Sequence, residues 1–227
     1  MTFNQLDHLG FQISHDLKGP VRVLSLNLDM LLRALDQNDF ARAREMAEMA
    51  LSTSRKLTRL MEGLAGLSMA GKARPDEIVD MKELVTEALE KLSLQIAAHK
   101  VKIIVDLPDK AYVDAVHMIE VWQQLIDNAI RYSADVNSSE PKKIKISSMK
   151  SDNGEIFCIE DNGHGVSHDM LPQLFSSLIT NTNDEVSPGL GLLYCRRVIE
   201  RHGGKIWHER SEGRTKFLFS IPAKINF

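Results

Sequence analysis

Residues 14–21 read SHDLKGPV, which places a histidine beside a carboxylate on a long amphipathic segment. Apolar residues follow with alternating spacings of four and three, at Leu17, Val21, Leu24, Leu28, Leu31 and Leu35. This alternation is typical of a helix in a coiled coil or helical bundle. His15 and Asp16 fall outside the apolar seam, so we expect both side chains to face solvent or a partner. Pro20 lacks an amide proton and should bend the helix near this pair.

A single histidine on a helix is most often an ordinary surface residue, and that reading stays open for His15 when it is taken alone. The neighbouring carboxylate of Asp16 could, however, hold one ring nitrogen protonated and leave the other as a nucleophile. Residues 14–21 resemble the H box of sensor histidine kinases, whose usual form is S-H-E/D-L-x-x-P-L. The resemblance implies that His15 receives a phosphoryl group and that Asp16 assists the transfer.

The composition suits a soluble chain that forms one large domain or two small ones, with 227 residues, 43% hydrophobic and 26% charged. The net charge is −3, and no basic stripe with interleaved aromatic residues supports nucleic-acid binding. No apolar run is long enough to cross a membrane, so we expect no membrane contact within this chain. The only cysteines, Cys158 and Cys195, lack metal-type spacing, and a reducing cytoplasm is the expected compartment.

Two long helices are predicted at the start of the chain, over residues 4–36 and 40–69, with a polar turn between them. The second helix has an apolar seam at Phe40, Ala43, Ala47, Ala50, Ser54, Leu57, Met61 and Leu64. Residues 1–70 should therefore form an antiparallel hairpin. The resemblance implies that this hairpin serves dimerisation and histidine phosphotransfer. Its wide apolar stripes favour a homodimer with a four-helix bundle. The alternative is a monomeric hairpin packed on the rest of the chain.

Residues 71–76, which contain Gly71 and Pro75, are predicted to be a linker. Mixed helices and strands follow over residues 77–227, and we expect a mixed sheet with helices on one face. The predicted strands are 77–81, 101–105, 111–113, 143–146, 155–160, 205–209 and 215–221. The predicted helices are 82–98, 115–132 and 190–202, with Gly203 as the C-cap of the last. The fold class is thus α+β, with a helical hairpin followed by an α/β sandwich of the histidine-kinase ATPase type.

Residues 125–133, LIDNAIRYS, resemble the N box of the same kinases. The resemblance implies that Asn128 is a ligand of Mg²⁺, a cation that accepts neutral oxygen ligands when phosphates and water supply the rest. It also implies that Arg131 lies near the phosphates and that Tyr132 lines the nucleotide site. Gln124 stands where the family often has a second asparagine. The alternative is an ordinary amphipathic helix with an exposed asparagine.

Residues 160–166, EDNGHGV, follow an apolar strand and resemble the first glycine box, D-x-G-x-G. In the family this aspartate accepts a hydrogen bond from the adenine amino group, a role that would fall to Asp161. Gly163 and Gly165 allow positive φ and a close approach of backbone to ligand. A tight turn after a strand is the other reading of this stretch.

Residues 171–175, LPQLF, resemble the F box, and the polar segment 176–188 is predicted to be a lid over the nucleotide. Gly189 and Gly191 begin the next helix and resemble the second glycine box, whose backbone amides can cradle phosphates. The predicted lid has no lysine or arginine, so phosphate charge would be met by Mg²⁺, Arg131 and backbone amides.

These motifs together favour an ATP-dependent protein-histidine kinase that autophosphorylates His15 with Mg-ATP. The resemblance implies that the phosphoryl group then passes to an aspartate in the receiver domain of a response regulator. We expect either a stand-alone kinase or a piece of a longer receptor. Two alternatives stay open. One is a phosphotransfer scaffold whose nucleotide domain is degenerate. Three features are compatible with it: Gln124, Ser187-Pro188 in place of a Gly-Thr pair, and the uncharged lid. A target other than histidine, as in other ATPases of this fold, is disfavoured by the intact H box.

Overall fold

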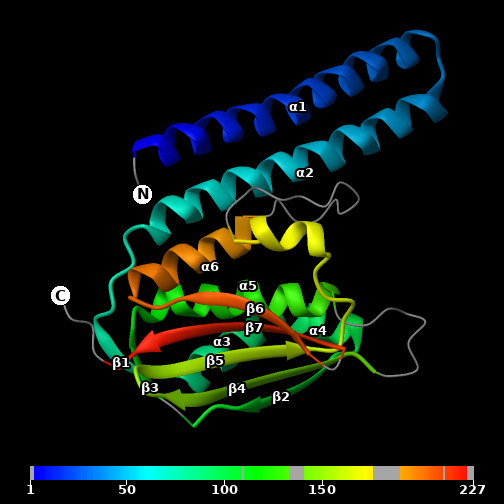
Figure 1. The fold of residues 1–227 in the computed structure, drawn as a ribbon. Coiled ribbons are helices and arrows are strands. Elements are labelled where there is room, and N and C mark those ends of the chain that lie inside the picture. The colour runs from blue at the N-terminus through cyan, green and yellow to red at the C-terminus, as the bar shows by residue number, and fades with distance from the viewer. Residues whose placement is uncertain (1–2, 109, 133–140, 176–189, 212, 224–227) are drawn as a thin grey trace. The chain divides into compact units, whose positions relative to one another are not determined.

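A computed structural model describes residues 3–108, 110–132, 141–175, 190–211 and 213–223, with side chains from Leu17 onward. The chain divides into two compact units (Figure 1). The first comprises residues 1–65 and 178–190, and the second comprises residues 66–177 and 191–227. Each unit is described by itself. None of the helices in the described ranges is both long and apolar enough to span a membrane.

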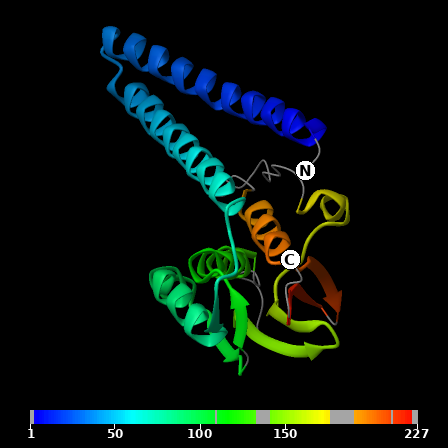
Figure 2. The same ribbon diagram turned by 90° about the vertical axis from the view of Figure 1, so that its left-hand side faces the viewer.

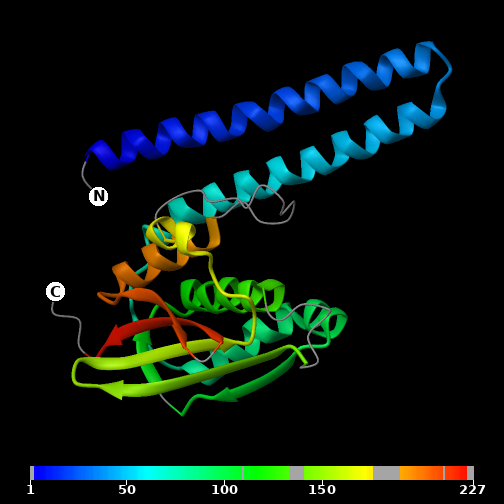
Figure 3. The same cartoon turned by 45° about the vertical axis from the view of Figure 1, so that its right-hand side comes forward.

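The first unit is built on a hairpin of two antiparallel helices, α1 (Phe3–Asp36) and α2 (Phe40–Ala70), as Figure 3 shows. Asn38 forms the turn with a left-handed φ of 54°, a conformation that asparagine tolerates better than most residues. The Asp39 carboxylate then caps α2 by accepting a hydrogen bond from the Arg42 amide at 3.1 Å. The helix boundaries agree with the sequence prediction to within one residue.

The hairpin has more apolar side chains than it buries. The buried positions of the two helices include Asn27, Ala34, Ala43, Met46, Ala50 and Leu60. Large apolar side chains that stay exposed are Val21, Val23, Leu26, Leu28, Leu32, Leu35, Phe40, Met49, Leu51 and Met61. Part of the seam predicted from sequence is therefore exposed in the single hairpin. Apolar residues on two faces of one helix leave the rotational phase of its buried face undetermined by periodicity alone.

The second unit contains a five-stranded mixed sheet and a separate two-stranded ribbon. The five-stranded sheet has the order β2-β4-β5-β7-β6, where β2 and β4 are parallel and all other neighbours are antiparallel. The ribbon pairs β1 with β3. The strands are β1 (Glu77–Asp80), β2 (Lys102–Asp106), β3 (Lys110–Val113), β4 (Lys143–Ser151), β5 (Gly154–Asp161), β6 (Ile206–Ser211) and β7 (Arg214–Pro222). The sequence analysis placed β1 and β3 in one sheet with the others, whereas the structure separates them.

Helices gather on one face of the five-stranded sheet, as Figure 2 shows. They are α3 (Met81–Lys91), α4 (Ser93–His99), α5 (Ala115–Tyr132), the 3-10 helix η1 (His168–Gln173) and α6 (Leu190–Arg201). Helix α5 is anchored by Trp122, whose ring meets Phe157 at 6.0 Å and Phe219 at 5.1 Å, edge to face. The predicted helix 82–98 is in fact two helices, because Leu92 leaves the helical conformation with φ −97° and ψ 5°. The α+β class and the helix-on-sheet sandwich are confirmed.

The linker, residues 71–76, lies against the second unit and forms hydrogen bonds with it. The Asp114 carboxylate accepts the Arg74 amide at 3.2 Å, and the Arg201 Nε donates to the Ala73 carbonyl at 3.4 Å. His117 of α5 contacts the Met69 carbonyl at 3.2 Å through Nε2. Ala70 and Ala73 are fully buried. Gly71 and Pro75 correctly indicated that residues 71–76 form neither helix nor strand. They did not indicate that hydrogen bonds hold this segment against the start of α5 and against α6.

A buried histidine completes this anchoring. The His202 Nε2 accepts the Asp114 amide at 2.9 Å, so the other ring nitrogen, Nδ1, carries the proton and donates to the Val198 carbonyl at 2.8 Å. Burial lowers the pKa of His202 and keeps its ring neutral near pH 7. Gly203 follows with a φ of 74° and ends α6, as the sequence predicted.

Candidate functional site

One face of α5 is polar and the opposite face is buried in the core. The buried face holds Met118, Ile119, Val121, Trp122, Leu125, Ile126, Ala129 and Ile130. The half-buried polar face holds Glu120, Gln123, Gln124, Asp127, Asn128 and Arg131. Spacings of three and four put these polar side chains on one stripe. The helix thus presents Asn128 on a solvent-accessible stripe, as its proposed contact with a bound group requires.

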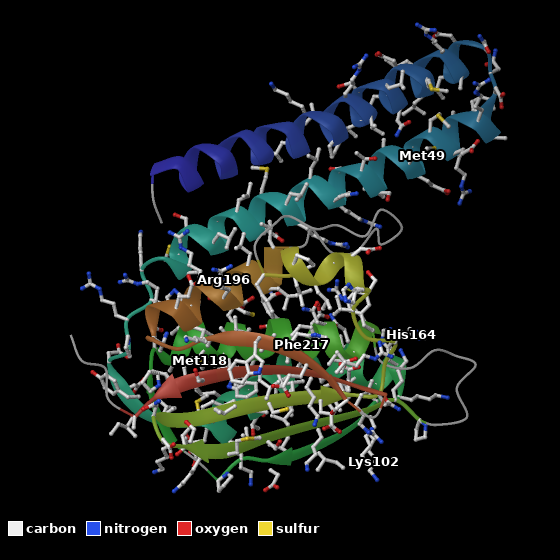
Figure 4. All side chains as sticks on the ribbon, in the orientation of Figure 1. Met49, Lys102, Met118, His164, Arg196 and Phe217 are labelled. Atoms are coloured by element: carbon white, nitrogen blue, oxygen red, sulfur yellow. The ribbon has the colours of Figure 1, made fainter. Side chains whose placement is uncertain are left out.

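The loop after β5 lies against the C-terminal end of α5. A Cβ on Gly163 would overlap the Tyr132 carbonyl oxygen, so only glycine fits this close approach. Gly165 has a φ of 78°, which also favours glycine. Figure 4 shows His164 at the end of the sheet to which β5 runs. The stretch identified as the first glycine box therefore brings bare backbone beside the helix that carries Asn128.

Asp161, the last residue of β5, is a buried carboxylate with 2% of its surface exposed. Its Oδ1 accepts the Gly163 amide at 2.8 Å, which fixes the side chain. Burial raises the pKa of Asp161 to about 6, against the opposing effect of that hydrogen bond. The carboxylate is thus largely ionised at pH 7 while shielded from water. Such a group is suited to accept a hydrogen bond from a ligand amine.

Two further residues lie in one row with Asp161 across β5, β7 and β6. Thr215 is the strand partner of Asp161, and Arg210 is the strand partner of Thr215. Thr215 is buried, and its hydroxyl, like the charge of Arg210, opposes the effect of burial on the pKa of Asp161. The Arg210 guanidinium donates to the His164 carbonyl and occupies the space beside Gly165. The sequence analysis missed Thr215 and Arg210, since a cross-strand row becomes visible only once strand register is known.

Arg131 is held in an ion pair with Asp127, one turn earlier on α5. The two side chains are 24% and 14% exposed, so the pair is half-buried and its charges offset each other. Lys142 adds a second cation near the end of α5, since its Nζ donates to the Ile130 carbonyl at 3.4 Å. The expected contact of Arg131 with phosphate stays a prediction and would require this ion pair to be shared or broken.

The second glycine box contacts α5 at Gln124, one turn before Asn128. A Cβ on Gly191 would overlap the Gln124 Oε1 and would stand 3.2 Å from the Gln124 Cδ. The glycine therefore leaves room for this side chain. Gly189 and the predicted lid, residues 176–188, lie outside the described residues. In the F-box stretch, Phe175 packs edge to face on Phe217 at 6.2 Å, and Figure 4 shows Phe217 between the helices and the sheet.

His15 and Asp16 lie in the backbone of α1, well before the hairpin turn. Their positions in one continuous helix agree with the predicted helical H box. Pro20 is also accommodated inside this helix. His15 and Asp16 belong to the first unit, whereas Asn128 and Asp161 belong to the second. The roles of His15 and Asp16 stay predictions.

The side chains that could act as metal ligands suit an ion held mainly by the phosphates of a nucleotide. The described ranges contain no group of three or more His, Cys, Asp or Glu residues that could hold a metal ion. Asn128 and Gln124 provide amide oxygens on adjacent turns of one stripe. Mg²⁺ commonly keeps phosphate and water ligands and takes only one or two from the protein. The residues present are therefore compatible with Mg²⁺ that arrives with the phosphates of a nucleotide.

Comparison with known proteins assigns a class to this fold. Residues 113–225 match the family model of histidine kinase-, DNA gyrase B- and HSP90-like ATPases. The chain is 30% identical over 224 residues to the methanogenesis regulatory histidine kinase FilI of Methanothrix harundinacea, covering 96% of this chain and 25% of FilI. It thus spans about a quarter of the length of that relative.

Solved structures agree with this assignment over both units. Histidine kinase AdeS of Acinetobacter baumannii is similar with a TM-score of 0.70 and 26% identity, covering 93% of this chain and 98% of AdeS. Histidine kinase ThkA, solved in complex with the response regulator TrrA, shares the fold with a TM-score of 0.72 at 21% identity, covering 96% of this chain and 62% of ThkA.

The C-terminal part of the chain is therefore an ATPase-type nucleotide-binding domain of the histidine kinase class. The chain as a whole belongs to the sensor histidine kinases and has the organisation of their catalytic core, a helical hairpin followed by this domain.

Proposed function

We propose that this chain is an ATP-dependent protein-histidine kinase that autophosphorylates His15 and passes the phosphoryl group to an aspartate of a response regulator. The observation that carries the proposal is the buried, largely ionised Asp161 beside the bare backbone of Gly163. This pair offers a carboxylate acceptor for the amino group of adenine, held in place by the Gly163 amide. The H box of α1 supplies the acceptor of phosphate.

The nucleotide would lie along the polar stripe of α5. The first glycine loop touches the helix at Tyr132, and the second glycine segment touches it at Gln124. These two contacts are eight residues apart, or about 12 Å at the rise of an α-helix. With adenine at the Asp161 end, the phosphates would point toward Asn128, Gln124 and Gly191. Asn128 would hold Mg²⁺ there, where the ion supplies charge neutralisation for the phosphates.

The transfer itself would need positioning and charge stabilisation more than covalent help from the protein. The unprotonated nitrogen of His15 forms a bond to the γ-phosphorus while the bond from that phosphorus to the β–γ bridging oxygen breaks, and ADP leaves. Asp16 accepts a hydrogen bond from the other ring nitrogen and stabilises the positive charge that develops on the imidazole. A receiver aspartate then takes the phosphoryl group from the phosphohistidine.

Homodimerisation would cover the exposed stripe of the hairpin. Val21, Leu28, Leu35 and Phe40 are between 44% and 68% exposed, and the first three follow the apolar seam of α1. A second hairpin laid against this stripe makes a four-helix bundle and removes the apolar surface from water. The response regulator would dock on the same bundle near His15. The solved complex of ThkA with TrrA is a structural relative that carries such a partner.

The test is to incubate the chain with Mg-ATP labelled on the γ-phosphate and to look for acid-labile, base-stable label. His15→Gln should abolish the label, while His8→Gln, on the same helix, should retain it. Label that persists in His15→Gln would show that the phosphate acceptor is another residue. Analytical ultracentrifugation of the same preparations gives the oligomeric state, and a monomer would contradict the bundle.

The phosphotransfer scaffold remains the second candidate because Gln124 replaces the family asparagine and Arg131 is committed to Asp127. It predicts no label and no nucleotide binding by the wild type. It also predicts that phosphate would move from a phosphorylated regulator to His15 without ATP. Calorimetric titration with ADP and Mg²⁺ separates the two candidates directly.

A further inference from the structure

Gln124 is held by a carboxylate one turn earlier on α5. Its Nε2 donates to the Glu120 Oε1 at 2.7 Å, and the pair is partly buried. An ionised carboxylate can only accept hydrogen bonds, so the amide nitrogen of Gln124 must face Glu120. The amide oxygen then points the other way. The structure agrees, because the Oε1 lies where a Cβ of residue 191 would be.

The charge of Glu120 is also felt on α6. Burial raises the pKa values of Tyr194 and Cys195, and the negative charge of Glu120 raises both further. Cys195 also directs its Sγ at the Val121 carbonyl, 3.8 Å away, so α5 and α6 are packed at this level. Glu120 is therefore a half-buried carboxylate at a level where α5 and α6 are packed, and such a group can hold a neighbouring amide in one orientation.

The orientation of the Gln124 amide decides how this side chain would interact with phosphates near the second glycine segment. The second glycine segment offers backbone that would approach phosphates. A carbonyl oxygen directed at phosphates is repelled unless a cation lies between them, whereas an amide N–H₂ in the same place would bind the phosphate itself. The two orientations of Gln124 would thus give opposite dependences on a divalent cation.

We propose that Glu120 is a positioning residue that fixes the Gln124 amide with its oxygen toward Gly191, so that a glutamine works beside Asn128 at the metal–phosphate end of the site. This role rests on the proposed function. It accounts for how this chain keeps a usable amide oxygen although the side chain is one methylene longer than the asparagine of the family. Residues that orient a metal ligand typically change metal affinity or activity by about 10- to 100-fold when replaced.

Calorimetric titration with ADP, once with Mg²⁺ and once with excess EDTA, tests the role without requiring activity. Glu120→Gln frees the Gln124 amide to turn, because a glutamine side chain can donate as well as accept. We expect ADP to bind about tenfold more weakly in Mg²⁺ and with equal or higher affinity in EDTA, where a turned N–H₂ group could donate to the phosphate. Glu83→Gln, on the exposed face of α3, is the matched control for the loss of one charge and should behave as wild type.

A role through charge alone makes the opposite prediction. Removing a negative charge near a polyanion strengthens or preserves ADP binding in both conditions. Tighter binding by Glu120→Gln in Mg²⁺, or no change there, would therefore overturn the positioning role. Absence of ADP binding by the wild type would overturn the nucleotide site itself and this role with it.

A double-mutant cycle shows whether Glu120 acts through Gln124. Gln124→Asn restores the family residue with a side chain too short to keep the same bond to Glu120. In this background Glu120→Gln should no longer change the Mg²⁺-dependent affinity for ADP. An equal tenfold loss in both backgrounds would show that Glu120 acts independently of Gln124 and would refute the inference.

Discussion

Replacement of Asp161 by asparagine should stabilise the protein and at the same time weaken its binding of ATP. The folded structure raises the pKa of this carboxyl from its usual 3.8 to about 6, mainly by burial. A shift of roughly two units corresponds to about 3 kcal/mol by which the ionised form disfavours folding. An asparagine at this position would have the same shape without the charge, and the buried Thr215 hydroxyl on the neighbouring strand is available to its amide.

The pH dependence has a definite sign. Between pH 3.8 and about 6 the folded state holds a proton on Asp161 that the unfolded chain has lost. The free energy of unfolding of the wild type therefore falls as pH rises through this window. Above the window, the ionised Asp161 lowers it by the full amount. The advantage of Asp161→Asn should be about 3 kcal/mol at pH 8 and about half of that at pH 5.

Urea unfolding followed by the fluorescence of buried Trp122 measures this difference at the two pH values. Asp169→Asn, an exposed residue of η1, controls for the loss of one negative charge. Nucleotide affinity should fall about 10- to 100-fold in Asp161→Asn, as expected for loss of a charged hydrogen-bond acceptor. An Asp161→Asn variant that is less stable than wild type at pH 8, or equally shifted at both pH values, would refute the reasoning.

Three other changes test separate parts of the molecule. Gly163→Ala should abolish ADP binding in calorimetry and lower the free energy of unfolding by about 2 kcal/mol or more, because its Cβ would overlap the Tyr132 carbonyl; retained binding would contradict the close approach. Asn27→Leu should raise the midpoint of urea unfolding, since the buried Asn27 Nδ2 has no partner among the described residues, at a cost of about 1–3 kcal/mol. A lower midpoint would mean that the amide is satisfied, for example across a dimer. Gly19 stands four residues after His15, where many related kinases use a side chain to orient water, so this chain should release little phosphate from a phosphorylated regulator; rapid release that persists in His15→Ala would contradict this.

The course of the chain could largely be predicted from sequence, and the exceptions have physical causes. The periodic spacing of leucine and alanine predicted both hairpin helices to within one residue. Seven strands were also predicted, but the alternation at residues 143–146 captured only the first part of β4, which runs to Ser151. The break at Leu92 was missed because its neighbours Lys91 and Ser93 carry no strong stop signal. Periodicity did not show which positions of α1 the single hairpin buries, because Asn27, a polar residue, is buried while several leucines are exposed.

The candidate site could be predicted only where a motif is continuous in sequence. Asp161, Gly163 and Gly191 belong to short glycine motifs, and the structure places the two glycines against α5 and Asp161 at the C-terminal end of the central strand β5. Thr215 and Arg210 belong to the same site through strand register, which local sequence does not encode. Glu120 was missed for a different reason, since its importance depends on the hydrogen bond that its side chain makes to Gln124.

The hydrogen-bonded linker fixes the rotation of the last turn of helix α2. Helix α2 runs without interruption to Ala70, and the hydrogen bonds of Met69, Ala73 and Arg74 attach its end to the ATP-binding unit. Each residue inserted in or deleted from the last turn of α2 would turn the helix by about 100°. The Met69 carbonyl would then face away from His117, and this contact would be lost.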